Sequence, residues 1–129
     1  MVIDVDEAGF QAQVLDRSRE IPVVVDFWAE WCGPCRQLTP ALEKAAQARG
    51  DEVVLAKVDT DANQQLAAAF QIQGIPAVKA FKDGKVVAEF TGVQPPARVE
   101  AFLDALVPSE AERLVAAGGE DDLRRALEL

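Results

Sequence analysis

Two cysteines separated by two residues are the side chains of this sequence best suited to chemistry. Cys32 and Cys35 stand in the run WCGPC, so their thiols lie about one helical turn apart and can form a disulfide after a small local movement. The run follows an apolar stretch typical of a strand and begins a stretch with helical periodicity. We therefore expect Cys32 at a helix N-terminus, where free N–H groups and the helix dipole stabilise an attacking thiolate, with Cys35 as the resolving thiol.

Two other uses of the cysteine pair fit the sequence less well. A tetrahedral zinc site needs four ligands, whereas the chain has two cysteines and no histidine, so a second copy would have to complete the site. A purely structural disulfide would close a very short loop, which removes little entropy from the unfolded chain. The absence of histidine also leaves Cys, Asp, Glu and Lys to carry any acid-base step.

Two charged residues interrupt apolar strands and are candidates for that acid-base step. Asp26 lies within the run 23–28 and Lys57 within the run 53–58. If the strands are neighbours, the two side chains approach one another directly or through water. A buried Asp26 would find a partner or keep a proton, because burial raises the pKa of a carboxyl group. The alternative is that both side chains point outward at a strand end, where a long lysine reaches solvent.

The periodicity along the chain indicates an α/β fold. Helices are expected after Asp6 and over residues 36–49, 63–70 and 99–106, and strands over residues 23–28, 53–58, 77–81 and 86–90. Asp83-Gly84 favours a tight hairpin turn between the last two strands. A parallel crossover half followed by an antiparallel hairpin requires a mixed central sheet, with the strand at 23–28 at its centre and helices on both faces.

Composition and charge narrow the classes of function. The chain has 129 residues, 50% of them hydrophobic, and 22 acidic against 13 basic side chains give a net charge of −9. Such a chain is globular, and nucleic acid or an anionic membrane would repel it. The first residues are acidic where a secretory signal is basic, and no apolar run approaches the length of a membrane span, so we expect a cytoplasmic protein. In that reducing compartment a close cysteine pair is more often catalytic than structural.

A proline near the C-terminus marks an expected boundary. We expect one domain over residues 1–107 and a short helical extension over residues 108–129. In the extension, Ser109 and Glu112 can form a capping box, and Gly118-Gly119 interrupts a helix-turn-helix pattern. Two such short helices are marginal unless they dock on something.

The residues alone say less about one proline and two tryptophans near the motif. Pro76 precedes a strand in the run Gly-Ile-Pro, and the residues alone leave its peptide bond either cis or trans. Trp31 adjoins the attacking cysteine and is expected to be exposed, whereas Trp28 is expected to be structural.

Several short segments, in order along the chain, resemble the bacterial thioredoxins. They are DFWAEWCGPC at 26–35, Lys57, GIP at 74–76, FKDGK at 81–85 and Gly92. The resemblance covers residues 1–107. It implies the thioredoxin fold and a protein-disulfide reductase that serves cell redox homeostasis.

The same resemblance implies a role for each matching residue. Cys32 would be the nucleophile and Cys35 the resolving thiol, while Asp26 would assist proton transfer with Lys57 nearby. Pro76 would follow a cis bond and face the cysteines. The residues that would line the substrate groove are Trp31, Gly33, Pro34, Ile75, Pro76 and Gly92. No cofactor would be bound, because electrons would come from NADPH through a flavin-containing thioredoxin reductase and pass to disulfide-containing proteins.

The sequence also departs from the family's common pattern. Arg36, Ala77 and Gln94-Pro95-Pro96 replace residues that are frequent in thioredoxins, and these changes bear on partner preference and redox potential. Residues 108–129 resemble the start of the helical region in thioredoxin-like co-chaperones with tetratricopeptide-type repeats. The alternative function is therefore a binding module that holds unfolded clients, or acts with a chaperone, through the groove and the C-terminal helices.

Overall fold

A five-stranded mixed sheet forms the centre of the computed structural model, which describes residues 1–107. The strands lie in the order β1-β3-β2-β4-β5, with the bounds β1 Val2–Asp4, β2 Val23–Trp28, β3 Val54–Asp59, β4 Ala77–Lys82 and β5 Lys85–Thr91. The first three run parallel to one another, while β4 is antiparallel to both β2 and β5. The predicted mixed sheet with β2 at its centre is confirmed, whereas the expected extension over 108–129 lies outside the described residues.

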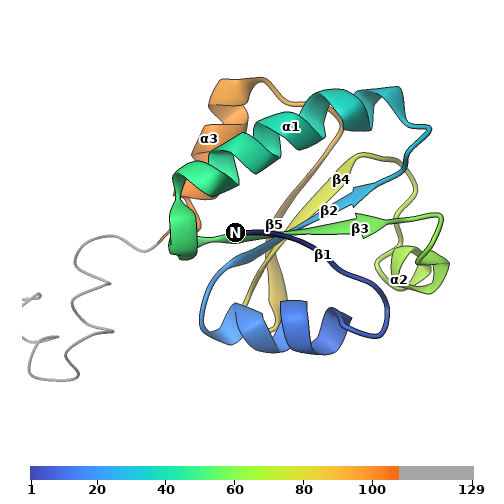
Figure 1. Ribbon diagram of the computed structural model, residues 1–129, viewed down its shortest axis with the longest axis horizontal. Coiled ribbons are helices and arrows are strands. Elements are labelled where there is room, and N and C mark those ends of the chain that lie inside the picture. The colour runs from blue at the N-terminus through green and yellow to red at the C-terminus, as the bar shows by residue number, and fades with distance from the viewer. Residues whose placement is uncertain (108–129) are drawn as a thin grey trace, which may run out of the picture.

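Helices cover both faces of this sheet (Figure 1). Helices α1 (Gly33–Ala48) and α3 (Pro96–Asp104) lie on one face. A π-helical turn, Gln11–Asp16, continues into a 3-10 turn, Arg17–Arg19, on the opposite face, and α2 (Gln64–Ala69) lies beyond the end of β3. A further 3-10 turn, Gly50–Glu52, follows α1.

Two apolar clusters, one on each face, hold the helices to the sheet. The cluster under α1 and α3 contains Val24, Leu38, Leu42, Leu55, Val78, Val99 and Leu103, all buried. The cluster on the opposite face contains Val5, Phe10, Val14, Val25, Phe27, Val58 and Phe81. Residues of β2 alternate between the two clusters, so this strand is buried on both faces as its apolar run, interrupted only by Asp26, predicts.

The N-terminal region differs from the prediction in two ways. Strand β1 pairs in parallel with β3 and was not expected, because three residues are too few to show an alternating pattern. The segment expected to be a regular helix after Asp6 instead forms turns followed by the π-helical and 3-10 turns. Asp6 accepts a hydrogen bond at its Oδ1 from the backbone N–H of Gly9 at 2.9 Å, within the turns, while the N-cap of the π-helical turn is Phe10.

The hairpin between β4 and β5 turns where the sequence predicts. Asp83 has φ +55° and Gly84 has φ +77°, the left-handed backbone pair that a two-residue hairpin turn requires. The backbone N–H of Gly84 donates to Ser18 Oγ at 2.8 Å, which ties the turn to the helical turns on that face. No helix within residues 1–107 is long and apolar enough to cross a bilayer.

Candidate active site

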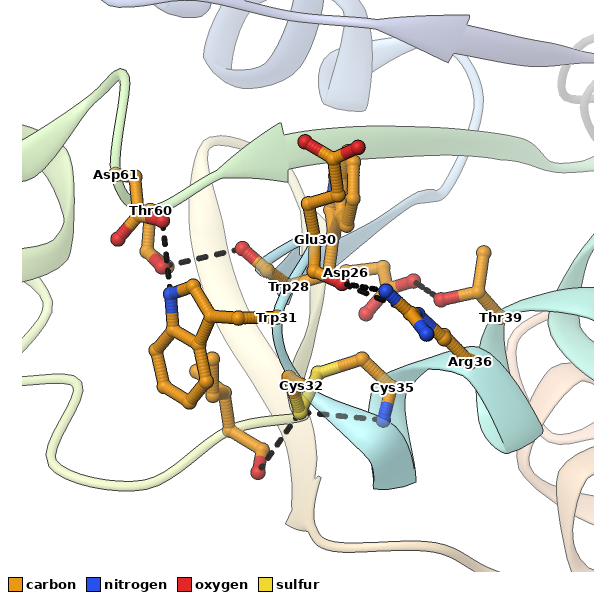
Figure 2. Close-up of a disulfide and its surroundings, with 11 residues drawn as sticks. Asp26, Trp28, Glu30, Trp31, Cys32, Cys35, Arg36, Thr39, Thr60 and Asp61 are labelled. Atoms are coloured by element: carbon orange, nitrogen blue, oxygen red, sulfur yellow. Dashed lines mark hydrogen bonds between the residues drawn. A yellow bond between two sulfur atoms is a disulfide. The ribbon is translucent and has the colours of Figure 1, made fainter.

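The two cysteines form a disulfide at the start of α1 (Figure 2). Cys32 is the N-cap residue, and its Sγ accepts a hydrogen bond from the backbone N–H of Cys35 at 3.2 Å. In the reduced protein this donor and the positive end of a 16-residue helix would both favour negative charge on Cys32 Sγ. Cys32 is 4% exposed and Cys35 is 1% exposed, so the first cysteine is the one nearer to solvent.

The segment before β4, which contains Ile75 and Pro76, approaches the disulfide. Cys32 Sγ lies 3.8 Å from the carbonyl oxygen of Ile75, and the Ile75–Pro76 peptide bond is cis, as the resemblance implies. The carbonyl of Pro76 accepts a hydrogen bond from the backbone N–H of Gly92 at 2.8 Å. Gly92 has φ +87°, a conformation that favours glycine over other residues. Cys32 Sγ is therefore contacted by Cys35 of its own helix and by Ile75 of the segment before β4, and Gly92 holds that segment through Pro76.

Trp31 stands on the exposed rim of this site. It is 68% exposed, as expected, and its Nε1 donates to Asp61 Oδ2 at 2.8 Å. On the other side of the motif, Arg36 Nε and Nη2 donate to the carbonyl oxygen of Glu30 at 3.1 and 2.7 Å. Figure 2 shows these two contacts flanking the disulfide. Gly33 and Pro34, the first two residues of α1, are exposed beside Cys32.

Asp26 lies fully buried in the middle of β2, and a position pointing outward at a strand end is excluded. Its Oδ2 accepts a hydrogen bond from Thr39 Oγ1 at 2.7 Å. Burial raises the pKa of Asp26 to about 6, while the Thr39 hydrogen bond and the charge of Lys57 lower it and the charge of Glu43 raises it. The carboxyl group therefore exchanges its proton close to neutral pH.

Lys57 pairs in register with Asp26 across β2 and β3, but its ion pair is with another residue. Its Nζ lies 3.0 Å from Glu43 Oε1 on α1 and 5.4 Å from the centre of the Trp28 ring. The lysine is half-buried, so its charge still acts on Asp26 at short range.

The structure thus places the cysteine motif, Ile75-Pro76 and Gly92 at the end of the sheet where β2 finishes, with Asp26 and Lys57 inside their strands. It also adds four residues that sequence reasoning missed. The missed residues are Glu30, Thr39, Glu43 and Asp61. Thr39 and Glu43 carried a usable signal, because they follow Cys35 at i+4 and i+8 and so continue one line along the helix. Asp61 and the Glu30 carbonyl belong to loops, where spacing in the sequence carries no such signal.

Comparison with known proteins agrees with this geometry. The sequence matches the family model Thioredoxin over residues 1–105. The thioredoxin of Rhodospirillum rubrum is 45% identical over 103 residues, covering 80% of this chain and 97% of that protein. Thioredoxin C-2 of Corynebacterium nephridii is 41% identical over 103 residues, covering 80% and 94%, and the thioredoxin of Mycobacterium tuberculosis (strain CDC 1551 / Oshkosh) is 40% identical over 107 residues, covering 83% and 90%.

The chain belongs to the thioredoxin family. Its Cys32–Cys35 disulfide is accordingly a redox-active pair, and the protein is a protein-disulfide reductase that works by dithiol-disulfide exchange. Thioredoxins carry no bound cofactor, because the cysteine pair is itself the redox group. Membership also implies exchange with disulfide-containing proteins and with a thioredoxin reductase.

Metal chemistry gains no support from the part of the chain that the structure describes. Within residues 1–107, no group of three or more His, Cys, Asp or Glu side chains is arranged to hold an ion. The cysteines are bonded to each other, and the buried carboxyl group of Asp26 accepts a hydrogen bond from the Thr39 hydroxyl group.

Proposed function

We propose that Cys32 attacks the substrate and Cys35 completes the exchange. In the first step, the Cys32 thiolate forms a bond to one sulfur of a protein disulfide, and the substrate's own S–S bond breaks. The released substrate thiolate takes a proton from solvent. The observation that supports this order is that Cys32 caps α1 and accepts the Cys35 N–H, while Cys35 lies deeper.

The second step regenerates the disulfide and needs a base. Cys35 loses its thiol proton to the carboxylate of Asp26, and its sulfur attacks Cys32 Sγ. The Cys32–Cys35 bond forms, the bond to the substrate breaks, and the second substrate thiol leaves. Two electrons have then passed from the dithiol to the substrate. The pKa of Asp26, raised by burial to about 6, suits a group that accepts a proton at neutral pH.

The proposal assigns contact with the substrate to six residues of the cysteine motif, the segment before β4 and the end of β5. They are Trp31, Gly33, Pro34, Ile75, Pro76 and Gly92. The 3.8 Å approach of the Ile75 carbonyl to Cys32 Sγ supports this role, because an extended peptide bound there would meet backbone groups next to the reacting sulfur. Lys57 contributes a nearby charge to Asp26 and no direct contact with the substrate.

The physiological setting of the proposal is the cytoplasm, with a flavin-containing thioredoxin reductase as electron donor. A cycling reductase must return to the dithiol form after every turnover, which requires a reducing compartment and a partner that accepts electrons from NADPH. The co-chaperone alternative depends on residues 108–129, which lie outside the described residues, and family membership does not favour it.

Reduction of insulin tests the assigned roles directly. The full chain, with NADPH and a bacterial thioredoxin reductase, is expected to reduce insulin, while Cys32→Ser abolishes turnover. Cys35→Ser is expected to accumulate a mixed disulfide between Cys32 and insulin, visible by mass spectrometry of the intact complex. Absence of turnover by the unaltered chain, or trapping through Cys35 in the Cys32→Ser variant, would overturn the proposal.

A further inference from the structure

Three polar residues run along one side of α1, next to its apolar face. Cys35, Thr39 and Glu43 are spaced at i, i+4 and i+8, so they stack one turn above another. Their neighbours at Leu38 and Leu42 are buried in the apolar cluster of this face. The line faces β2 and β3, where Asp26 and Lys57 sit side by side in register.

The two oxygens of the Asp26 carboxyl group have different surroundings. Oδ2 accepts the 2.7 Å hydrogen bond from Thr39 Oγ1. Oδ1 is buried and has no hydrogen-bond partner among residues 1–107. Leaving a buried oxygen unpaired is unfavourable, so the one hydrogen bond that the carboxyl group does make has a large effect on it. The Thr39 hydroxyl therefore sets the orientation of the Asp26 carboxyl group.

A cavity of about 240 Å³ extends from Cys35 to the Thr39 side chain. Its lining residues are Trp28, Cys35, Arg36, Thr39, Pro40 and Lys57. Asp26 is not among them, and of the lining residues Thr39 is the one that donates a hydrogen bond to Asp26. The volume suffices for water, and a hydroxyl group can accept a hydrogen bond from the cavity while donating one to the carboxylate.

None of the charged or titratable side chains that the structure describes around Asp26 hydrogen-bonds to it in place of Thr39. From β3 comes Lys57, whose Nζ is paired with Glu43 at 3.0 Å rather than with Asp26. From α1 come Glu43 and Cys35, and β4 presents the apolar Val78 at the register position opposite Asp26. Thr39 is therefore the one side chain within residues 1–107 that hydrogen-bonds to Asp26.

We propose that Thr39 is a positioning residue that connects the Asp26 carboxylate to the cavity beneath Cys35 and so sets the rate at which Cys35 loses its proton. The inference rests on the proposed role of Asp26. In the resolving step the proton leaves Cys35, passes through cavity water and the Thr39 hydroxyl, and ends on Asp26. The hydroxyl gives one proton and receives another, so it is unchanged after each turnover, and the electron pair left on Cys35 forms the new S–S bond.

A two-phase reaction separates the resolving step from the attack. Reduced protein mixed with one equivalent of dithiobis(nitrobenzoate) releases one coloured nitrothiolate when Cys32 attacks and a second when Cys35 closes the disulfide. Because the Thr39 hydrogen bond favours the charged carboxylate, its loss raises the pKa of Asp26 further. Thr39→Val, which keeps the shape and removes the hydroxyl, is expected to slow the second phase severalfold near pH 6, to move its pH midpoint upward and to leave the first phase unchanged.

Two further variants make the result specific. Thr39→Ser keeps the hydroxyl and is expected to restore the pH profile of the second phase. In an Asp26→Asn background, Thr39→Val is expected to have no further effect, because the group through which Thr39 acts is gone. An unchanged profile in Thr39→Val, an equal slowing of both phases, or the same slowing in the Asp26→Asn background would overturn the proposal. Failure of the proposed function itself would appear differently, as a missing second phase in the unaltered chain.

Discussion

Asp26 is the residue whose burial has the largest consequence for both stability and chemistry. A carboxyl group without solvent contact is held at the centre of β2, with one hydroxyl as its hydrogen-bond partner and one ion pair nearby. Desolvation dominates, so the folded state binds the Asp26 proton more tightly than the unfolded state does.

That difference predicts a pH-dependent stability. Because the pKa of Asp26 is about 6 in the folded state, against an ordinary value of 3.8, the folded state binds more protons between these values and loses stability as pH rises through them. Asp26→Asn removes this dependence and is expected to stabilise the oxidised protein by about 3 kcal/mol at pH 8, with little effect near pH 4. Guanidinium unfolding at both pH values measures it, and an equal effect at the two would contradict the assignment.

Glu43 permits a second test of the same carboxyl group. The glutamate raises the pKa of Asp26 by its own charge and also holds Lys57 at 3.0 Å. Glu43→Gln removes the negative charge and weakens the hold on Lys57, so both effects lower the pKa of Asp26. Titration of the Asp26 carboxyl carbon by NMR is expected to show a lower midpoint, whereas the exposed Glu20→Gln control leaves it unchanged. A higher midpoint in Glu43→Gln would contradict the predicted charge effects.

At the scale of elements, Arg49 fastens the end of α1 to α3. Its guanidinium lies within 2.7 Å of both Glu100 and Asp104 and also donates to the carbonyl oxygen of Ala45 at 2.8 Å. The arginine side chain is 12% exposed, but Glu100 and Asp104 are 49% and 70% exposed, so solvent screens the ion pairs and the part-buried hydrogen bond to Ala45 adds to their effect. The clamp holds together the two helices that cover the active-site face.

Arg49→Met, which keeps the aliphatic stem, is therefore expected to destabilise the fold by about 1–2 kcal/mol. The exposed Arg98→Met on α3 serves as the matched control and is expected to change stability by less than about 0.5 kcal/mol. Guanidinium unfolding at pH 7 measures the change in stability of both variants. Equal effects of the two variants would show that the clamp contributes nothing of its own.

The sequence predicted helices, strands and turns correctly where a segment was long or where its turn residues strongly favour one type of turn. The apolar residues around Asp26 predicted the buried strand β2, and Asp83-Gly84 predicted the hairpin turn. Strand β1 was missed because its stability comes from pairing with β3, a contact between residues far apart in the sequence. The irregular first helix was missed because apolar spacing does not distinguish π and 3-10 turns from a regular α-helix.

At the scale of the whole molecule, the site is assembled where the end of β2, the start of α1 and the segment before β4 meet. The motif predicted the cysteines and their place on a helix, and the apolar strands predicted the burial of Asp26. The cis bond at Pro76 came from family resemblance alone, since local residues leave both isomers open. The Glu43–Lys57 pair joins a helix to a strand, so spacing along the sequence contained no sign of it.

The expected boundary at Pro108 gives a prediction for the molecule as a whole. A chain ending at Val107 keeps both apolar clusters and every site residue named above, so it is expected to unfold at the same guanidinium concentration and to reduce insulin at the same rate as the full chain. Suppression of the aggregation of a denatured client, compared between the two chains, tests the co-chaperone alternative. Loss of cooperative unfolding in the shorter chain would show that the domain needs residues after Val107.

The central claim is that the start of α1 holds Cys32 as a thiolate while Cys35 stays protonated. Alkylation of the reduced protein by limiting iodoacetamide at pH 7, with the modified residue identified by mass spectrometry, tests it most directly. The account predicts that nearly all of the label is on Cys32, because its sulfur is the N-cap group and the more exposed of the two. Equal labelling of the two cysteines, preferential labelling of Cys35, or no reaction at either would contradict it.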